Sequence, residues 1–336
     1  MRDLRNKFLM TVTVLAASAA LVGCGPTKHQ AGTAILNPIE ISETSQGFTF
    51  TEGKEKVMFY QRRHKALNGK YSRANYIHPL YGLDGEILTE DFPADHLHHR
   101  GIFWAWHQVW LGDKRLGDPW AAKGFFWDVY EAKILAVDSQ SNALQVHVHW
   151  KSPLWTDANG KQKAFVKETT TIRVYRAQDD IRKIDFQIYL LALEDSVRIG
   201  GSEDDKGYGG FTTRIRLPDG VSFTGSNGPV EPNRLSVEAG PWLDFAGEFD
   251  KDGKVSGLAI LCHNSSPGYP QRWILRRKAS AQNPVYPGRH PILLSRKEPL
   301  VLRYRLIIHR GYLNHINLDK LQAEYNSESL PVFDGR

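Results

Sequence analysis

Residues 144–150 read Leu144-Gln145-Val146-His147-Val148-His149-Trp150. Apolar and polar residues alternate strictly along this stretch, so a strand built from it has one apolar face and one polar face. The pattern therefore predicts a β-strand that packs its apolar face into a core. His147 and His149 share the polar face, which antiparallel sheets commonly turn toward solvent. We expect both to be exposed strand residues.

Strand signals of the same kind recur along the chain. Residues 167–175 are rich in β-branched residues, and residues 184–190 alternate again after a turn signal at residues 178–180. Together they predict a long antiparallel hairpin. Further strands are expected at residues 48–51, 57–60, 258–261 and 300–308. Only residues 319–325 show helical spacing. Many strands and few short helices predict an all-β fold, a large antiparallel β-sandwich or a barrel-like stack.

The N-terminal residues predict export from the cytoplasm. A positively charged start is followed by an apolar stretch at residues 8–22. This stretch has the length of a signal peptide and is shorter than the roughly 20 apolar residues of a transmembrane helix. It ends in Leu21-Val22-Gly23-Cys24-Gly25, which resembles the lipobox of bacterial lipoproteins. The resemblance implies that Cys24 is lipidated and begins the mature protein. An ordinary cleaved signal with an unrelated cysteine is the alternative.

The lipobox divides the chain into three expected parts. Residues 1–23 would be the signal peptide, residues 24–38 a lipidated tether, and residues 39–336 a single β-sandwich domain. Gly25, rather than Asp, follows the cysteine, which by resemblance to enterobacterial sorting favours the outer membrane. We therefore expect a lipid-anchored protein of the bacterial cell envelope.

Charge and cysteine content argue against a nucleic-acid-binding protein and against a disulfide-rich one. The formal net charge of +6 comes partly from the signal peptide, and Lys and Arg are scattered without a long basic run, so nucleic-acid binding is not expected. The chain has 2 cysteines. If Cys24 is acylated, Cys262 has no partner within the chain and no disulfide framework forms. Cys262 ends an apolar run, which predicts a buried, small hydrophobic residue.

Titratable chemistry is most concentrated in residues 95–101, which read Asp95-His96-Leu97-His98-His99-Arg100-Gly101. Histidine titrates near neutrality, so such a cluster suits proton transfer or metal binding. In an extended segment His96 and His98 share one face, where they could begin a divalent-metal site. His78 is a candidate third ligand, although the spacing does not require it.

Acid–base catalysis would need fewer residues of the same cluster than a metal site does. His98 or His99 would donate or remove a proton, with Asp95 orienting one of them. Arg100 would hold an anionic or polyhydroxy group. A structural alternative is a salt bridge between Asp95 and Arg100, with histidines that cap turns. Three histidines in one short segment favour a functional role.

A second constellation lies at residues 203–211, Glu203-Asp204-Asp205-Lys206-Gly207-Tyr208-Gly209-Gly210-Phe211. Its glycines permit positive φ angles or a close approach of the backbone to a ligand. The segment lacks the spacing of a phosphate-binding loop, and a plain hairpin turn is the alternative. Together with Arg214, the side chains of Lys206 and Tyr208 predict one wall of a polar pocket.

Tryptophans crowd the residues that follow the histidines. They are Trp104, Trp106, Trp110, Trp120 and Trp127. Most must pack in the core, but flat aromatic faces also stack on the apolar faces of sugar rings. We expect one or two to face a ligand, in line with the few specific contacts of most pockets, and Trp106 to be among them. A pocket lined in this way suits a carbohydrate.

Several motifs together resemble one bacterial family. They are His78-Pro79-Leu80-Tyr81, residues 95–101, Lys206-Gly207-Tyr208-Gly209-Gly210-Phe211 and Trp242-Leu243-Asp244-Phe245-Ala246-Gly247. Over most of its mature length the chain looks like a member of the family labelled "methane oxygenase PmoA-like". Methane oxidation itself is not implied. A methane monooxygenase subunit spans the membrane several times, and the mature chain has no run of about 20 apolar residues.

The resemblance implies an extended β-sandwich similar to the galactose-mutarotase-like supersandwich. In folds of that kind a histidine acts as the acid and a carboxylate as the base at the anomeric carbon of a sugar. His98 or His99 would be that histidine here. No motif position identifies the base, for which Glu168, Glu203 and Asp204 are candidates.

The leading hypothesis is an envelope lipoprotein enzyme, an epimerase, hydrolase or lyase, that acts on a sugar or oligosaccharide. Catalysis would rest on His98, His99 and Asp95. The residues expected to bind substrate are His78, Arg100, Trp106, Lys206, Tyr208 and Arg214. No organic cofactor is expected, and a divalent metal at His96 and His98 stays open. The alternative is a non-catalytic, surface glycan-binding lipoprotein, whose histidines are structural or hold a structural metal.

Overall fold

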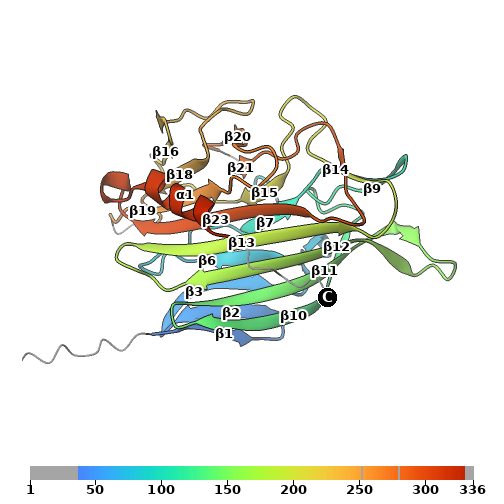
Figure 1. The fold of residues 1–336 in the computed structure, drawn as a ribbon, viewed down its shortest axis with the longest axis horizontal. Coiled ribbons are helices and arrows are strands. Elements are labelled where there is room, and N and C mark those ends of the chain that lie inside the picture. Colours follow the sequence, from blue (N-terminus) through green and yellow to red (C-terminus); the bar gives the residue numbers. More distant parts are fainter. Residues whose placement is uncertain (1–36, 251–252, 279–280, 330–336) are drawn as a thin grey trace, which may run out of the picture. The chain divides into compact units, whose positions relative to one another are not determined.

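The computed structural model describes residues 37–250, 253–278 and 281–329. From Asn37 onward these residues form one compact unit, built mainly from two β-sheets that lie against each other (Figure 1). The nine strands of the larger sheet, in order across it, are β10 (Phe126–Asp138), β11 (Ser141–Thr156), β12 (Gln162–Tyr175), β13 (Ile181–Ala192), β23 (Leu300–Arg310), β19 (Ser256–Cys262), β18 (Trp242–Gly247), β16 (Ser222–Gly225) and β17 (Gly228–Pro229).

Smaller sheets complete the fold. The second sheet has six strands, β1 (Ile39–Glu43), β2 (Gly47–Glu52), β3 (Glu55–Gln61), β6 (Tyr76–Leu80), β7 (Ile102–Ala105) and β15 (Gly210–Thr213). A third sheet has the order β22 (Ile292–Leu293), β14 (Val197–Gly200), β8 (Gln108–Leu111) and β9 (Lys114–Gly117). Two further pairs are β20 (Trp273–Ile274) with β21 (Asn283–Pro284), and β4 (Lys65–Leu67) with β5 (Lys70–Arg73). The described helices are a 3₁₀ turn, η1 (Leu313–His315), and α1 (Leu318–Ser327).

The predicted strands and hairpin are confirmed. Residues 144–150 lie within β11, where Leu144, Val146 and Val148 are fully buried. β12 and β13 pair antiparallel with Ile172 opposite Phe186. This is the all-β, antiparallel class that the alternation predicts, with one short α-helix among the described residues.

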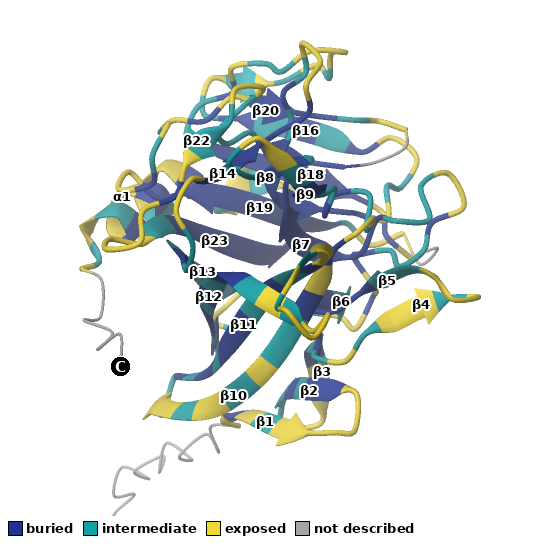
Figure 2. Ribbon diagram, turned by 90° about the vertical axis from the view of Figure 1, so that its right-hand side faces the viewer, coloured by how far each residue is buried: buried dark blue, intermediate teal, exposed yellow. Residues whose placement is uncertain are grey.

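The expected exposure of His147 is wrong. Its side chain is only 11 % exposed, because Tyr130 of the neighbouring strand β10 lies 6.0 Å away between ring centroids. Its Nδ1 also lies 3.1 Å from the hydroxyl of Thr169. Tyr130 and Thr169 thus partly cover His147 on the polar face of this sheet. Figure 2 shows the mixed exposure along β10 and β11.

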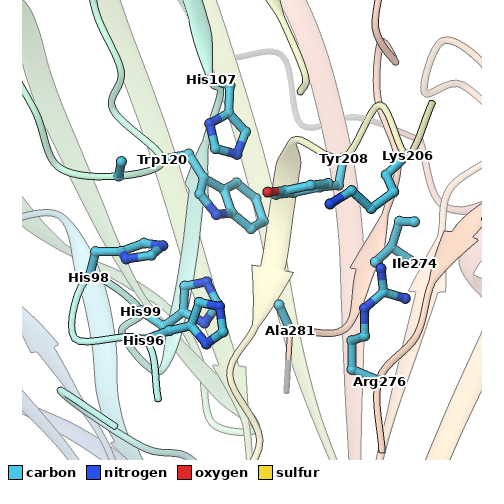
Figure 3. Close-up of a pocket in the computed structure, with 11 residues that line it drawn as sticks. His96, His98, His99, His107, Trp120, Lys206, Tyr208, Ile274, Arg276 and Ala281 are labelled. Carbon is cyan, nitrogen blue, oxygen red and sulfur yellow. The ribbon is translucent and has the colours of Figure 1, made fainter. Parts of the chain in front are cut away.

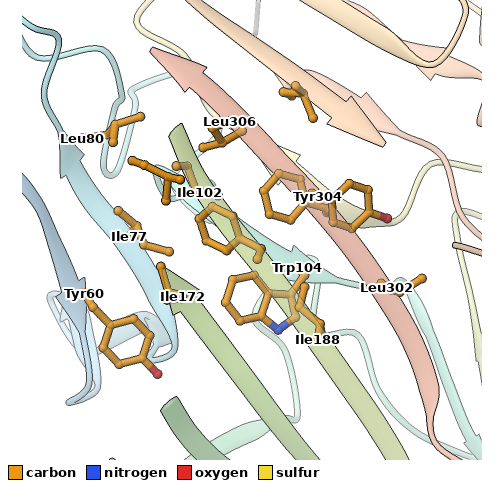
Figure 4. Packing of buried hydrophobic residues seen from close by; sticks show 14 of the residues in the cluster. Tyr60, Ile77, Leu80, Ile102, Trp104, Ile172, Ile188, Leu302, Tyr304 and Leu306 are labelled. Carbon is orange, nitrogen blue, oxygen red and sulfur yellow. The ribbon is translucent and has the colours of Figure 1, made fainter. Parts of the chain in front are cut away.

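One apolar core lies between the two large sheets. Figure 4 shows Ile77, Ile102 and Trp104 from the six-stranded sheet facing Ile172, Ile188, Leu302, Tyr304 and Leu306 from the nine-stranded sheet. Each fully buried side chain of this size contributes about 1.5–3 kcal/mol, so this core dominates the stability of the sandwich. Cys262 is buried in the same cluster, as predicted.

Helix α1 covers the opposite face of the nine-stranded sheet. Its Leu318 and Tyr325 pack against Leu261 and Ile307. The side chain of Asn317 accepts a hydrogen bond from the backbone N–H of Lys320 at 2.9 Å, which caps the first turn. The helix predicted from the spacing at residues 319–325 is confirmed.

Candidate functional site

A cavity of about 400 Å³ opens among the loops that precede β7, follow β9 and precede β15. Five predicted site residues line it, His96, His98, His99, Lys206 and Tyr208. Six other residues complete the lining, His107, Trp120, Ala121, Ile274, Arg276 and Ala281. Figure 3 shows the histidine loop on one side of this cavity and Lys206 with Arg276 on the other. The structure therefore brings the histidine and glycine motifs together across one cavity.

The histidine loop is folded into two successive turns and is not extended. The N–H of His96 donates to the carbonyl of Pro93 at 3.1 Å, and the N–H of His99 donates to the carbonyl of His96 at 2.8 Å. Turns place the first and fourth residues side by side, so the rings of His96 and His99 stack with centroids 4.8 Å apart. His98 meets His99 edge-on at 4.6 Å. The shared face expected for His96 and His98 in an extended segment does not form.

Arg214 holds His99 in its neutral form. Its Nη1 donates to Nδ1 of His99 at 3.3 Å, and because a guanidinium has no acceptor, Nδ1 must be the lone-pair nitrogen. Burial lowers the pKa of His99 far below its usual value, and the neighbouring His98 and Arg214 lower it further. The Nε2 of His99 therefore carries the proton at neutral pH.

Asp95 contacts Arg214 and His96 of this cluster. One carboxylate oxygen accepts from Arg214 at 2.7 Å, and the other lies 3.5 Å from Nδ1 of His96. Partial burial would raise the pKa of Asp95, but the hydrogen bond and charge of Arg214 outweigh it and lower that pKa. Asp95 thus contacts His96 directly and His99 only through Arg214. The expectation from the sequence, that Asp95 itself orients His98 or His99, is not met.

His98, like His96, is half-buried. Burial lowers its pKa to about 4, helped by the positive charge of Arg73 and by the neighbouring His96. The ring is therefore uncharged at neutral pH and offers a lone pair to the cavity. Such a group accepts a proton and does not act as a cation.

His107 and Asp118 form an oriented pair that the sequence analysis does not identify. Nδ1 of His107 lies 3.0 Å from a carboxylate oxygen of Asp118, whose other oxygen accepts from the N–H of Ala121 at 2.9 Å. Burial by itself would raise the pKa of Asp118, but the hydrogen bond from His107 lowers it overall. The carboxylate fixes the tautomer of His107 with the proton on Nδ1, so Nε2 faces away from Asp118 with its lone pair. Nε2 is buried and makes no hydrogen bond to any described residue.

Aromatic rings enclose this histidine. Trp120 stacks on His107 with centroids 5.4 Å apart, and Tyr208 meets the two rings edge-on at 4.8 and 4.9 Å. We call His107, Trp120 and Tyr208 the aromatic corner. Burial, with Asp204 nearby, raises the pKa of Tyr208, so its phenol keeps its proton.

The glycine motif shapes the wall that carries Tyr208. Gly207 and Gly210 have φ angles of 59° and 93°, which favour glycine. A Cβ on Gly209 would lie 2.9 Å from Cα of Gly201, so the chain can pass there only without a side chain. Of the three residues predicted to form one wall of a pocket with this motif, Lys206 and Tyr208 line the cavity and Arg214 does not.

Four residues expected to bind substrate do not line this cavity. His78 lies beside the hydroxyl of Thr89 at 3.0 Å. Arg100 is fully buried, pairs with Asp91 at 3.1 Å and stacks on the ring of Phe92. Its partner is therefore Asp91, not the Asp95 of the structural alternative.

Trp106 and Arg214 complete this group of four. Trp106 is a core residue whose Nε1 donates to the carbonyl of Tyr286 at 2.9 Å. The position expected for Trp106 beside a ligand is held by Trp120. Arg214, only 5 % exposed, supports the histidine loop through His99 and Asp95.

The three candidate carboxylate bases occupy different environments. Glu168 is fully buried in β12 and accepts hydrogen bonds at 2.8 Å from each of four donors, Asn75, Trp104, Trp150 and Thr170. Glu203 is exposed and pairs with Arg115 at 2.8 Å. Asp204 accepts from Lys206 at 2.9 Å and from Ser202 at 2.7 Å. None of the three lines the cavity.

A metal site does not appear among the side chains that the structure describes. No group of three or more His, Cys, Asp or Glu side chains is arranged there to hold a metal ion. The histidine loop forms two successive turns and not an extended segment. These turns stack the rings of His96 and His99 on one another instead of spreading them around a metal ion.

Sequence reasoning missed the residues that complete the cavity. His107 directly follows the aromatic run, but nothing in its spacing links it to Asp118, which belongs to a turn after β9. Arg276 carries no motif at all, and Trp120 is one of five tryptophans among which the sequence does not choose. Only the tertiary fold selects them from many similar residues.

The fold and the cavity together define a class of protein, an all-β sandwich with a cavity lined by histidines, aromatic rings and cations. Residues 48–323 match a family described as a family of unknown function, DUF6807, and the chain belongs to that family. The methane-oxygenase label has no support from this match. A search of curated proteins finds no match.

Two solved structures are similar in outline. A galactose 1-epimerase from Lactobacillus acidophilus NCFM is 11 % identical with a TM-score of 0.37, covering 82 % of this chain and 98 % of that chain. A putative mutarotase from Salmonella typhimurium is 8 % identical with a TM-score of 0.31, covering 82 % and 92 %. Likeness at this level does not bear on substrate or reaction.

The predicted signal peptide, lipidation site and most of the tether lie outside the described residues, which begin at residue 37. Within the part that is described, no helix has the length and apolar character needed to span a membrane.

Proposed function

We propose that this protein is a carbohydrate-active enzyme that transfers protons with the histidines of the cavity. One observation carries the proposal: His107, oriented by Asp118 at 3.0 Å, shares a cavity with the uncharged His98. An orienting carboxylate behind an imidazole is the arrangement that prepares a histidine for acid–base work. Tyr208, the half-buried ring of the aromatic corner, supplies an aromatic surface for a sugar ring beside it.

The proposed chemistry follows from the two histidines. His107 accepts a proton on Nε2 while Asp118 stabilises the imidazolium that forms, and it then returns the proton to the product. His98 serves as a second acceptor or orients a hydroxyl. Nε2 of His107 is enclosed beside Tyr208, and hydrogen bonds of this kind commonly form only once substrate is bound. Epimerisation, hydrolysis and elimination each need such an acid–base pair.

The cavity has the size for a small sugar. Its volume of about 400 Å³ lies within the roughly 300–1,000 Å³ of small-molecule sites. A single residue or a short end of an oligosaccharide is the expected occupant.

Non-catalytic glycan binding is the second candidate. It is favoured by the absence of Asp and Glu among the described residues that line the cavity, which leaves histidines as the only bases. Turnover decides between the two functions.

The test is a panel of monosaccharides and oligosaccharides, with binding measured by calorimetry and turnover by NMR. We expect one substrate to turn over, and His98→Ala to lower kcat/KM about a hundredfold or more while binding persists. Because only the uncharged form of His98 accepts a proton, the part of kcat/KM that His98→Ala removes should be present at neutral pH and be lost as the pH falls toward the His98 pKa of about 4. Binding without turnover of any sugar would support the non-catalytic candidate and overturn the enzyme.

We also propose that Cys24 anchors the protein to the cell envelope, at the outer membrane. The lipobox-like sequence before it supports this location. Cells that express the protein and are fed a clickable palmitate analogue should label the wild type, whereas Cys24→Ala should abolish the label and release the protein to the soluble fraction. Equal labelling of a Cys262→Ser control is expected. Labelling that persists in Cys24→Ala would contradict the anchor.

A further inference from the structure

Arg276 faces the cavity, and no carboxylate of the described residues pairs with its charge. Its Nη1 donates at 2.7 Å to the carbonyls of Asn233 and Leu275, and its Nη2 donates at 3.0 Å to the carbonyl of Arg234. These bonds use three of the five N–H groups of a guanidinium and fix the side chain in place. Among the described residues it forms no ion pair with Asp or Glu. Main-chain carbonyls orient the cation without neutralising it.

A second unpaired guanidinium adjoins the opposite wall. Arg73 is 1 % exposed and donates to the carbonyls of Pro119 and Trp120 at 2.6 and 3.0 Å. It also lies 4.5 Å from the ring centres of Phe103 and Trp127. In the described part of the chain it, too, has no carboxylate partner. A buried positive charge of this kind raises the potential of the space beside it.

The carboxylates near the cavity are already engaged. Asp118 accepts from His107, Asp204 from Lys206, and Asp95 from Arg214. The histidine loop adds no compensating negative charge, since His98 and His99 are neutral. Of the two cations that line the cavity, Lys206 is therefore paired, and Arg276 is the one without a carboxylate partner among the described residues. A neutral sugar would leave Arg276 unmatched.

We infer that the substrate is an anionic sugar, one that carries a carboxylate, sulfate or phosphate group, and that Arg276 holds this group with Lys206 beside it. Figure 3 shows both cations on the side of the cavity that faces away from His98. The anionic group would thus fix the sugar at one end while its reacting carbon meets the histidines at the other. This inference rests on the proposed sugar site and narrows its substrate class.

The test compares matched sugars by calorimetry on the purified protein. The pairs are glucuronate with glucose and galacturonate with galactose, and glucose 6-sulfate and glucose 6-phosphate identify which anionic group is preferred. We expect the anionic member of at least one pair to bind more than tenfold tighter than the neutral one. Raising the salt concentration should weaken the anionic member selectively.

Variants assign the preference to Arg276. Arg276→Gln should weaken binding of the preferred anionic sugar by about tenfold to a hundredfold and leave the neutral sugar within a factor of about two. Arg276→Lys keeps the charge and should retain part of the preference. Arg277→Gln is the matched control, because its neighbouring guanidinium is exposed and already pairs with Glu231 at 3.1 Å; it should change nothing. Thermal unfolding of each variant separates a folding defect from a binding defect.

Distinct outcomes contradict the inference and the proposed function. Equal binding of neutral and anionic sugars overturns the inference and leaves the sugar enzyme standing. The same holds for an anionic preference that survives in Arg276→Gln. Tight anionic binding without turnover supports the inference and overturns the enzyme. Failure of every sugar to bind overturns both.

Discussion

Replacing His107 by Gln lowers kcat/KM for the proposed sugar substrate by about a hundredfold to ten-thousandfold, the usual contribution of a positioned acid–base group. Gln keeps a polar group of similar length but cannot accept and return a proton. Substrate binding should persist, because the cations and the rings of Trp120 and Tyr208 remain. Single-turnover kinetics together with calorimetric binding measure the two effects separately.

Two comparisons make this result specific. His315→Gln removes an exposed histidine outside the cavity and should leave kcat/KM unchanged. Asp118→Asn keeps the shape of the pair but no longer fixes the proton on Nδ1 of His107 or stabilises its imidazolium, so it should lower kcat and alter the pH profile. If His107→Gln retains full activity on a substrate that the wild type turns over, His107 is not the acid–base group.

Replacing Glu168 by Ala should cost a large part of the stability of the fold. Its carboxylate accepts hydrogen bonds at 2.8 Å from four donors, Asn75, Trp104, Trp150 and Thr170. Each buried donor left without a partner costs about 1–3 kcal/mol, so the free energy of unfolding should fall by at least about 4 kcal/mol. That is a large share of the roughly 5–15 kcal/mol typical of a folded domain. Chemical denaturation followed by tryptophan fluorescence measures it.

Graded variants distinguish this structural role from catalysis. Glu168→Gln keeps one acceptor oxygen but places an amide NH₂ against at least one of the donors, and should cost about 1–3 kcal/mol. Glu203→Ala removes an exposed carboxylate and should change the free energy of unfolding by less than about 1 kcal/mol. Burial raises the pKa of Glu168, and the four hydrogen bonds oppose that rise. Normal stability with lost turnover in Glu168→Gln would instead identify Glu168 as the base.

Glu168 illustrates why a list of candidate carboxylates cannot be ordered from sequence. Glu168, Glu203 and Asp204 all follow or flank readable motifs, yet one is enclosed in the core, one is exposed and one pairs with Lys206. The difference lies in what the two sheets and the loops pack around each side chain. A single sequence shows that a carboxylate is present but not whether the fold buries it.

The histidine loop shows a similar division. Its position beside a cavity could be anticipated, because three histidines and a carboxylate in one short segment are unusual without a function. Its geometry could not, since the two turns depend on backbone hydrogen bonds to Pro93 and His96. Arg100 and Arg214 are chemically alike, but one is buried against Asp91 and the other supports His99.

Local patterning determined the sandwich. Strict alternation over residues 144–150 and 184–190 specifies strands with one buried face, because side chains along a strand alternate with a period of two and the apolar ones must leave water. Tertiary structure alone decided the contents of the cavity. Asp118 and Trp120 come from one loop and Arg276 from another, far along the chain, and they meet the histidines only because the sheets that carry those loops pack together. Periodicity acts between neighbours in sequence, whereas a site depends on distances between residues that only packing sets.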